Sequence, residues 1–363
     1  MDRRDFFKMS LVTGAGLLAS HSVIGNIIGK AEQNRLFAPE QSSGTFEKRQ
    51  LGGMGVSAIG LGCVDMCPVG YYGCRNKKDE IIKLIRHAFD NGITLFDTAE
   101  IYGMNVSEEW VGEALAPMRN QVKIETKFGF GVAEGQPGVL NSKPDHIRRA
   151  VEGSLKRLRT DHIDMLYQHR VDPEVPMEEV AATVQELIKE GKVLRWGLSE
   201  ASAESIRRAH AVQPLTAVES EYAIWWREPE TKIFPTLEEL GIAFVAYAPL
   251  GRGFLTGVFN ENSRFELPDR RAVLPRFMPE AMKHNMPLVR LIEKWSRQKG
   301  ITPAQFALVW ILSRKPWIVP VPGTTKITPG RIMRCEIRQA DSRGTVRFRC
   351  GLFKDQSYGA SGQ

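Results

Sequence analysis

Short apolar runs alternate with longer stretches of helical spacing from about residue 57 to residue 325. Apolar runs of this kind, bounded by turn residues, are typical of parallel strands that a sheet buries on both faces. The predicted strands are Ser57–Leu61, Thr94–Phe96, Val122–Glu125, Ile163–Gln168, Val193–Leu198, Ala217–Ser220, Ala243–Ala246 and Ile318–Val321.

A helical pattern follows each of the first seven predicted strands. Apolar residues recur at helical spacing in Lys77–Asn91 and in Met177–Glu190, where Gly191 ends the second pattern. Strands that alternate with crossover helices predict an α/β fold, here a (β/α)8 TIM barrel. A doubly wound sheet is the alternative, but it would carry its glycine-rich turn after the first strand. The glycines of Gly52–Gly55 precede that strand instead, and they predict an N-terminal β-hairpin that closes the bottom of the barrel.

Polar residues stand at the carboxyl ends of the predicted strands. Asp97, Lys127, His169 and Ser199 end the second to fifth strands, and Tyr102 lies five residues beyond Asp97. Each has a structural reading when taken alone, as a turn cap, a solvated charge or a buried core histidine. Because the carboxyl ends of barrel strands lead into loops at one face, we expect these side chains to meet there.

An Asp, a Lys, a His and a Tyr together form a proton-donating group. A phenol titrates near pH ~10 in water, and a neighbouring ammonium lowers that value by favouring phenolate. The carboxylate would hold the ammonium, and the imidazole would orient a carbonyl oxygen. The five cysteines match no zinc or iron–sulfur spacing, so we predict no metal site. The set suits protonation of an oxyanion while a cofactor delivers hydride to a carbonyl carbon.

Several motifs in this region resemble those of the aldo-keto reductase family. They are Leu95–Gly103, Glu125–Gly129, Asp161–His169, Gly191–Ser199 and Tyr247–Gly257. The resemblance runs in order from Leu51 to Lys326, and it implies a (β/α)8 barrel that reduces aldehydes or ketones with NADPH. It also implies that Tyr102 is the general acid, that Lys127 and Asp97 tune its acidity, and that His169 positions the carbonyl.

The resemblance further implies a cofactor site. Ser199 would hold the nicotinamide amide and Tyr222 would stack on the ring. The diphosphate would be lined by Leu250, Gly251, Gly253 and Leu255, with Gly323 and Lys326 at the phosphate end. Glu219 stands where the family usually has a Gln that contacts the carboxamide. A carboxylate accepts from the amide nitrogen but cannot donate to its oxygen, so we expect this contact to be weaker.

The chain departs from the family pattern after Lys326. The family's Arg that grips the adenosine 2′-phosphate is replaced by Pro329, and Gly330 follows. Both residues disfavour helices, so the sequence does not predict an eighth helix, and NADP versus NAD preference stays open. Arg331 is an alternative phosphate ligand. A shifted reading frame, a disordered tail and a divergent C-terminus are all open for residues 327–363.

Charge is concentrated at the two ends. The formal net charge is +7, of which +2 falls in residues 1–50, +5 in residues 326–363 and none between them. A neutral middle disfavours nucleic acid as a partner. The N-terminus has Arg3 and Arg4, then Phe6-Phe7-Lys8 and a short apolar run, which resembles a twin-arginine export signal. The run is too short to predict a stable membrane span.

We therefore divide the chain into a signal and linker (1–45), an aldo-keto reductase barrel (46–326) and a basic tail (327–363). The predicted function is an NADP-dependent oxidoreductase with a small carbonyl substrate, exported to the periplasm through the twin-arginine machinery, or cytoplasmic if the signal is inactive. Two alternatives are a nucleotide-binding barrel with impaired catalysis and, less favoured, a sugar isomerase or lyase barrel. The substrate, the reaction direction and the oligomeric state stay open.

The mouth of the barrel offers aromatic candidates for the substrate rim. They are Tyr71, Tyr72, Phe130, Trp225 and Trp226. Aromatic rims suit sugars and apolar carbonyls equally, and rings there also pack structurally.

Overall fold

The computed structural model describes residues 48–132, 134–327, 334–338 and 347–351. The predicted signal at the N-terminus and the altered positions Pro329 and Gly330 lie outside the described residues. No helix among the described residues is both long enough and apolar enough to cross a membrane.

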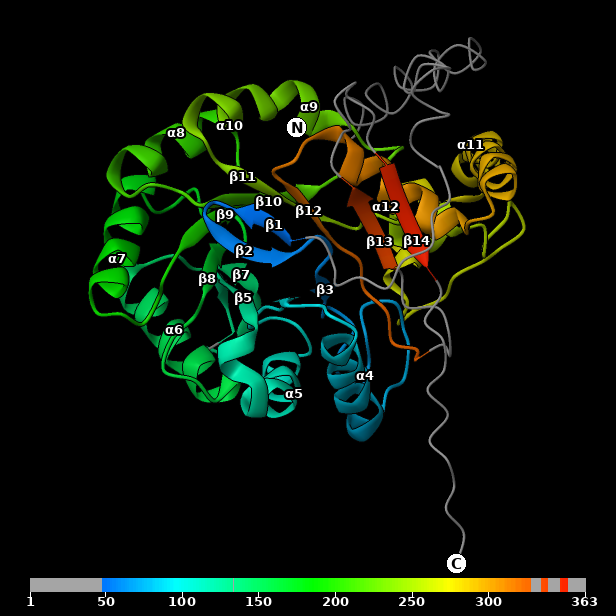
Figure 1. The fold of residues 1–363 in the computed structure, drawn as a ribbon. Coiled ribbons are helices and arrows are strands. Elements are labelled where there is room, and N and C mark those ends of the chain that lie inside the picture. The colour runs from blue at the N-terminus through cyan, green and yellow to red at the C-terminus, as the bar shows by residue number, and fades with distance from the viewer. Residues whose placement is uncertain (1–47, 133, 328–333, 339–346, 352–363) are drawn as a thin grey trace, which may run out of the picture. The chain divides into compact units, whose positions relative to one another are not determined.

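Eight parallel strands form the barrel, in the spatial order in which the chain supplies them (Figure 1). They are β3 (Leu61–Gly62), β4 (Leu95–Asp97), β5 (Lys123–Phe128), β8 (Met165–Gln168), β9 (Trp196–Ser199), β10 (Ala217–Glu221), β11 (Ala243–Tyr247) and β12 (Ile318–Val321). Almost every strand residue is buried, because the core covers one face and helices cover the other. A parallel bridge between Gly62 and Gly323 joins the first strand to the last and closes the barrel.

Helices connect successive strands and surround them (Figure 1). They are α4 (Lys78–Asp90), α5 (Val106–Leu115), α6 (Pro144–Leu158), α7 (Met177–Lys189), α8 (Ala203–Val212), α9 (Glu228–Lys232), α10 (Phe234–Leu240), α11 (Pro279–Lys299) and α12 (Pro303–Arg314). In α4 the buried residues recur at helical spacing from Ile81 to Ala88, as predicted. Short 3-10 turns, η2 (Ala116–Gln121), η3 (Gly251–Thr256), η4 (Arg270–Val273) and η5 (Pro275–Phe277), complete the connections.

An N-terminal hairpin closes the barrel bottom, which confirms that prediction. Strands β1 (Lys48–Leu51) and β2 (Met54–Ser57) pair through a two-residue turn. Gly52 and Gly53 both have positive φ, the conformation that such a turn requires. Apolar hairpin residues, including Leu51 and Met54, share one core with residues that begin the barrel strands, including Leu95.

The prediction for the first barrel strand was wrong in its bounds. Ser57 ends β2 of the hairpin, where it pairs with Lys48, and β3 begins only at Leu61. The intervening segment passes close to the last strand, because a Cβ on Gly60 would lie 2.9 Å from Cγ1 of Val321. The other seven strands lie within a few residues of their predicted bounds.

Two further strand pairs lie outside the barrel. Strands β6 (Phe130–Gly131) and β7 (Gln136–Leu140) form an antiparallel hairpin after β5. In the basic tail, β13 (Arg334–Arg338) pairs with β14 (Arg347–Gly351). The described residues beyond Val321 contain no helix, and residues 328–333, where an eighth helix would begin, lie outside the described residues.

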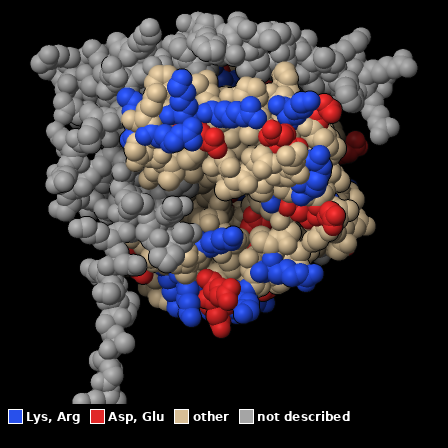
Figure 2. Space-filling view, turned by 90° about the vertical axis from the view of Figure 1, so that its right-hand side faces the viewer, with Lys and Arg blue, Asp and Glu red and all other residues tan. Residues whose placement is uncertain are grey.

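On the face drawn in Figure 2, Lys and Arg side chains lie among Asp and Glu side chains. Cys63, Cys67 and Cys74 are free thiols.

Candidate active site

Lys127 lies at the centre of the predicted catalytic group. It points into the barrel from β5 with a relative exposure of 1%. Its Nζ atom forms a short ion pair with Asp97 at the end of β4 and donates to the carbonyl of Thr98 at 3.0 Å. A second carboxylate, Oε2 of Glu219 from β10, lies 3.2 Å from the same nitrogen. Three strands therefore bring charged residues to one point; the strand ends predicted that Lys127 meets Asp97, whereas the contact with Glu219 was not predicted.

Tyr102 and His169 complete the group. The Nζ atom of Lys127 lies 5.3 Å from the centroid of the Tyr102 ring. The rings of Tyr102 and His169 meet edge to face with centroids 5.7 Å apart, and Phe130 packs on the other side of His169 at 5.2 Å. Among the described residues, the buried Nδ1 atom of His169 has no hydrogen-bond partner. The four predicted catalytic residues therefore lie together.

Burial and the local charges set the protonation states of this group. Burial raises the pKa of Tyr102 above its usual value, the charge of Lys127 opposes that rise, and the charges of Asp97 and Glu219 add to it. Burial alone would lower the pKa of Lys127, but the two carboxylates outweigh it and raise this pKa well above its usual range. Burial, assisted by Lys127, lowers the pKa of His169 well below its usual value. At neutral pH the group therefore holds a neutral phenol, an ammonium and a neutral imidazole.

The predicted amide contact, Ser199, ends β9 with a relative exposure of 1%. Its Oγ atom accepts a hydrogen bond of 3.2 Å from Arg170, whose guanidinium also donates to the carbonyl of His169. Sequence reasoning missed Arg170, although it follows His169 directly at a strand end. It adds a second positive charge to the group around Tyr102.

The predicted diphosphate segment lies in and before η3, after β11. Gly251 and Gly253 have positive φ, and so does Arg252 between them. The glycines are required by packing as well, because a Cβ on Gly251 would lie 2.8 Å from the ring of Trp225. Leu250 is half-buried, whereas Leu255 is fully buried and can present only its backbone to a ligand.

Tyr222 does not lie with the other site residues, which corrects its predicted position. Its ring is fully buried and packs against Phe234, Phe244 and Trp310, and its hydroxyl donates to Glu230 at 2.6 Å. Side chains alternate along a strand, so a residue three positions after the inward-facing Glu219 points outward. The ring therefore cannot stack on a nicotinamide.

Tyr247 is an aromatic residue at the carboxyl end of a barrel strand, close to the other site residues. It ends β11 opposite Glu221 of β10, and its half-buried ring packs against the barrel core. The guanidinium of Arg252 lies 6.0 Å from its ring centroid. The same guanidinium pairs with Glu221 at 3.0 Å. Tyr247 is the last residue of its strand, as Asp97 and Ser199 are of theirs, so its position at a carboxyl end could have indicated it as a site residue.

The phosphate end of the predicted site is open to solvent. Gly323 follows β12 and bridges to Gly62, and Lys326 is exposed, with its backbone N–H donating to Thr324 Oγ1 at 3.3 Å. The alternative phosphate ligand Arg331 lies outside the described residues.

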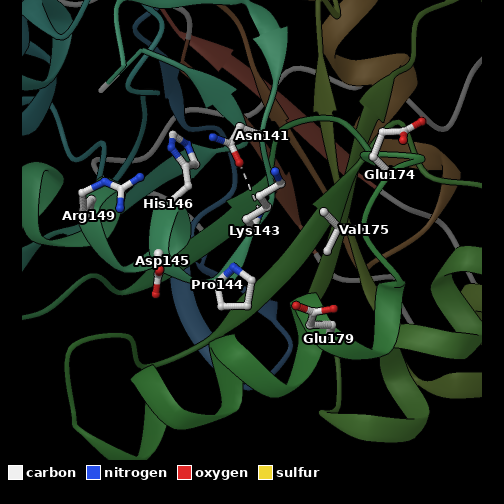
Figure 3. Close-up of a pocket in the computed structure, with 9 residues that line it drawn as sticks. All are labelled: Asn141, Lys143, Pro144, Asp145, His146, Arg149, Glu174, Val175 and Glu179. Atoms are coloured by element: carbon white, nitrogen blue, oxygen red, sulfur yellow. Dashed lines mark hydrogen bonds between the residues drawn. The ribbon is translucent and has the colours of Figure 1, made fainter.

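A separate hollow lies outside the barrel, where α6 begins (Figure 3). It has a volume of about 540 Å³ and contains none of the predicted site residues. Two of its three basic lining residues, His146 and Arg149, are paired with Glu134. The hollow therefore adds nothing to the catalytic group.

Comparison with known proteins identifies the family. Residues 59–329 match the aldo/keto reductase family. A probable aldo-keto reductase 1 from Glycine max is 43% identical over 280 residues, which cover 76% of this chain and 79% of the relative.

Solved structures give the same result for the fold. The glycerol dehydrogenase AKR11B4 from Gluconobacter oxydans matches with a TM-score of 0.69 and 30% identity, over 77% of this chain and 86% of that one. An aldo/keto reductase from Klebsiella pneumoniae, solved with NADP and acetate, matches in fold with a TM-score of 0.61 and 24% identity, over 78% and 87% of the two chains. The barrel, its group of Asp, Lys, His and Tyr and these relatives agree that the chain is an oxidoreductase that belongs to the aldo/keto reductase family.

Proposed function

We propose that this chain uses NADPH to reduce aldehydes or ketones to alcohols, or catalyses the reverse reaction with NADP⁺. The observation that carries the proposal is the buried Lys127 ammonium, held by Asp97 and placed beside the ring of Tyr102. A phenol beside a fixed ammonium is a proton donor whose conjugate base is stabilised where it forms.

In the reductive direction Tyr102 donates its proton to the carbonyl oxygen as negative charge develops there. Lys127 stabilises the phenolate that remains, and Asp97 keeps the ammonium in place. His169, neutral at pH 7, donates a hydrogen bond to the same oxygen and so orients the carbonyl. The reduced nicotinamide supplies the hydride when it is bound.

The residues at the barrel mouth fit a nicotinamide dinucleotide. Ser199 ends β9 and Tyr247 ends β11, the two strands that flank β10 and its Glu219. They offer a hydroxyl and an aromatic face to an amide-bearing ring. The loop Leu250–Leu255 and Arg252 would hold the diphosphate, with Gly323 and Lys326 near the 2′-phosphate. The structure of the Klebsiella pneumoniae relative with NADP supports the capacity of this fold for that cofactor.

The substrate is a small carbonyl compound that reaches His169 and Tyr102 past Phe130. Tyr71 has a relative exposure of 36% at the rim, and its ring meets Tyr72 edge to face at 5.2 Å. Trp225 stacks on Phe254 with centroids 5.3 Å apart, so it supports the loop after β11.

We further propose that residues 1–45 carry the protein through the twin-arginine pathway to the periplasm with its cofactor already bound. The support is the order of charged, aromatic and apolar residues around Arg3 and Arg4. Replacing both arginines by lysine should leave the protein in the cytoplasmic fraction. An unchanged distribution of the full chain between fractions would contradict export by this route.

Titration of the purified full chain with NADPH, followed by nicotinamide fluorescence, tests the redox function together with turnover of an aldehyde panel. We expect saturable binding and aldehyde-dependent loss of NADPH. Absence of binding would reject the proposal. If the protein binds NADPH but neither reduces any aldehyde nor oxidises any alcohol with NADP⁺, the nucleotide-binding alternative is favoured instead.

A further inference from the structure

Two carboxylates, rather than one, pair with the Lys127 ammonium. Asp97 and Glu219 both lie within ion-pair distance of its Nζ atom, and both are buried, with relative exposures of 3% and 1%. The deep burial of all three groups makes the charge of the second carboxylate effective.

The second carboxylate changes what Tyr102 experiences. One ammonium facing one carboxylate forms a neutral pair, whereas the same ammonium belongs to a cluster of charge −1 once Glu219 is ionised as well. Phenolate is stabilised by positive charge and destabilised by negative charge nearby. Ionised Glu219 therefore opposes the effect of Lys127 on Tyr102 and favours the protonated phenol.

We propose that Glu219, when ionised, is a positioning residue that acts through Lys127, holding Tyr102 as a neutral proton donor and so favouring carbonyl reduction over alcohol oxidation at alkaline pH. This inference rests on the proposed redox function and on the role of Tyr102 within it. It replaces the predicted contact of Glu219 with the nicotinamide amide by a contact with the catalytic ammonium.

Other titratable and charged groups also face Lys127 and Tyr102. Asp97 faces it from β4, and Glu125 lies two residues before it on β5, so both point into the barrel. Arg170 faces Tyr102 from the loop after β8 and lowers the pKa of Tyr102 slightly. Burial, the charge of Asp97 and that of Glu219 raise the pKa of Glu125 well above its usual range.

The remaining titratable neighbours are neutral near pH 7. Tyr167 of β8 donates to Oε1 of Glu125 at 3.0 Å, and burial raises its pKa well above its usual value. The lowered pKa of His169 keeps its imidazole neutral. Burial and the charge of Asp97 raise the pKa of Glu219 to about 8, while Lys127 opposes the rise. The charge of Glu219 therefore changes within the working pH range.

Glu219→Gln tests the inference, and Glu125→Gln is the matched control. Both changes replace a fully buried carboxyl by its isosteric amide inside the same barrel. Glu125 forms no ion pair with Lys127 within the described residues, and its amide keeps the oxygen that accepts from Tyr167. Thermal melting first establishes that each variant is folded.

The first readout needs no cofactor: phenolate absorbance of each protein during alkaline titration, with the same titration of its Tyr102→Phe derivative subtracted. We expect Glu219→Gln to lower the apparent pKa of Tyr102 by about one unit or more, which is a tenfold rise in phenolate at a fixed pH. Glu125→Gln and the charge-retaining Glu219→Asp should leave it unchanged. A coincident titration of Glu219→Gln and wild type would overturn the inference.

The second readout is the pH profile of kcat in both directions with NADPH and NADP⁺. Glu219→Gln should move the oxidation profile to lower pH by the same amount and weaken reduction at alkaline pH. A change confined to cofactor affinity would overturn the inference and restore the amide contact. If the wild type neither binds nor turns over the cofactor, the proposed function fails, while the phenolate titration still tests the coupling between Glu219 and Tyr102. If Glu219→Gln does not fold, Glu219→Ala takes its place under the same criteria.

Discussion

Replacing Lys127 by Met should destabilise the barrel as well as stop catalysis. The ammonium is buried. It pairs with the carboxylates of Asp97 and Glu219 and donates a hydrogen bond to the carbonyl of Thr98. Removing one partner of a buried ion pair leaves the other charge uncompensated or forces it to take up a proton, at a cost of about 3–5 kcal/mol. At about 2–4 °C per kcal/mol, the melting temperature should fall by roughly 10 °C.

The stability lost by Lys127→Met relative to wild type should increase as pH rises. Burial and Asp97 raise the pKa of Glu219 to about 8 in the folded protein even with Lys127 opposing them. Without Lys127 both carboxyls keep their protons to still higher pH, while the unfolded chain releases them near pH ~4. A group that is protonated in the folded state and ionised in the unfolded state lowers stability as pH rises. The deficit of Lys127→Met should therefore be larger at pH 9 than at pH 6.

Thermal melts of wild type and variant across this pH range measure the effect. Lys123→Met is the matched control on the same strand, because Lys123 is one-third exposed and its partner Asp164 keeps a second cation, Arg119. We expect the control to lose no more than about 1 kcal/mol. The reasoning is refuted if Lys127→Met melts like the control at pH 9, or if its deficit shrinks as pH rises.

Two further changes test the fold and the cofactor site. Tyr247→Ala should weaken NADPH binding roughly 2–10-fold, the value of one aromatic contact, whereas Tyr222→Phe should leave the fluorescence titration unchanged; equal effects would refute the placement of Tyr247. Gly52→Ala forces a Cβ to 2.4 Å from Cγ2 of Thr216 at positive φ, so chemical denaturation should show a loss of about 2 kcal/mol or more. Gly53→Ala, with nothing within 4 Å of its Cβ, should lose less; the reverse order would contradict the packing argument.

The barrel could be predicted from the sequence because its strands are buried on both faces and its helices on one. Those two patterns differ in period and alternate regularly, so seven strands were found with only small errors at their ends. The prediction of the first barrel strand was wrong because the segment from Ser57 onwards fits a hairpin strand and its connection as well as it fits a barrel strand. Only the pairing of Ser57 with Lys48 distinguishes them, and pairing is not a local property.

The catalytic group was predictable for a different reason. Asp97, Lys127 and His169 lie at or within one residue of the carboxyl ends of their strands, and the topology alone brings such ends together. Tyr222 was assigned from the resemblance without counting the alternation of side chains along β10, which turns it outward. The contact between Lys127 and Glu219 depends on the barrel interior, where a long side chain reaches across from one strand to another, and no sequence pattern reports it.

The central claim is that Tyr102 is the general acid of an NADPH-dependent carbonyl reductase. The most direct measurement compares wild type and Tyr102→Phe in steady-state reduction of an aldehyde, with NADPH affinity measured by fluorescence on the same preparations. The account predicts a loss of kcat of about 10²–10⁴-fold with unchanged NADPH affinity, because only the proton donor is removed. Reduction at the wild-type rate by Tyr102→Phe would contradict it.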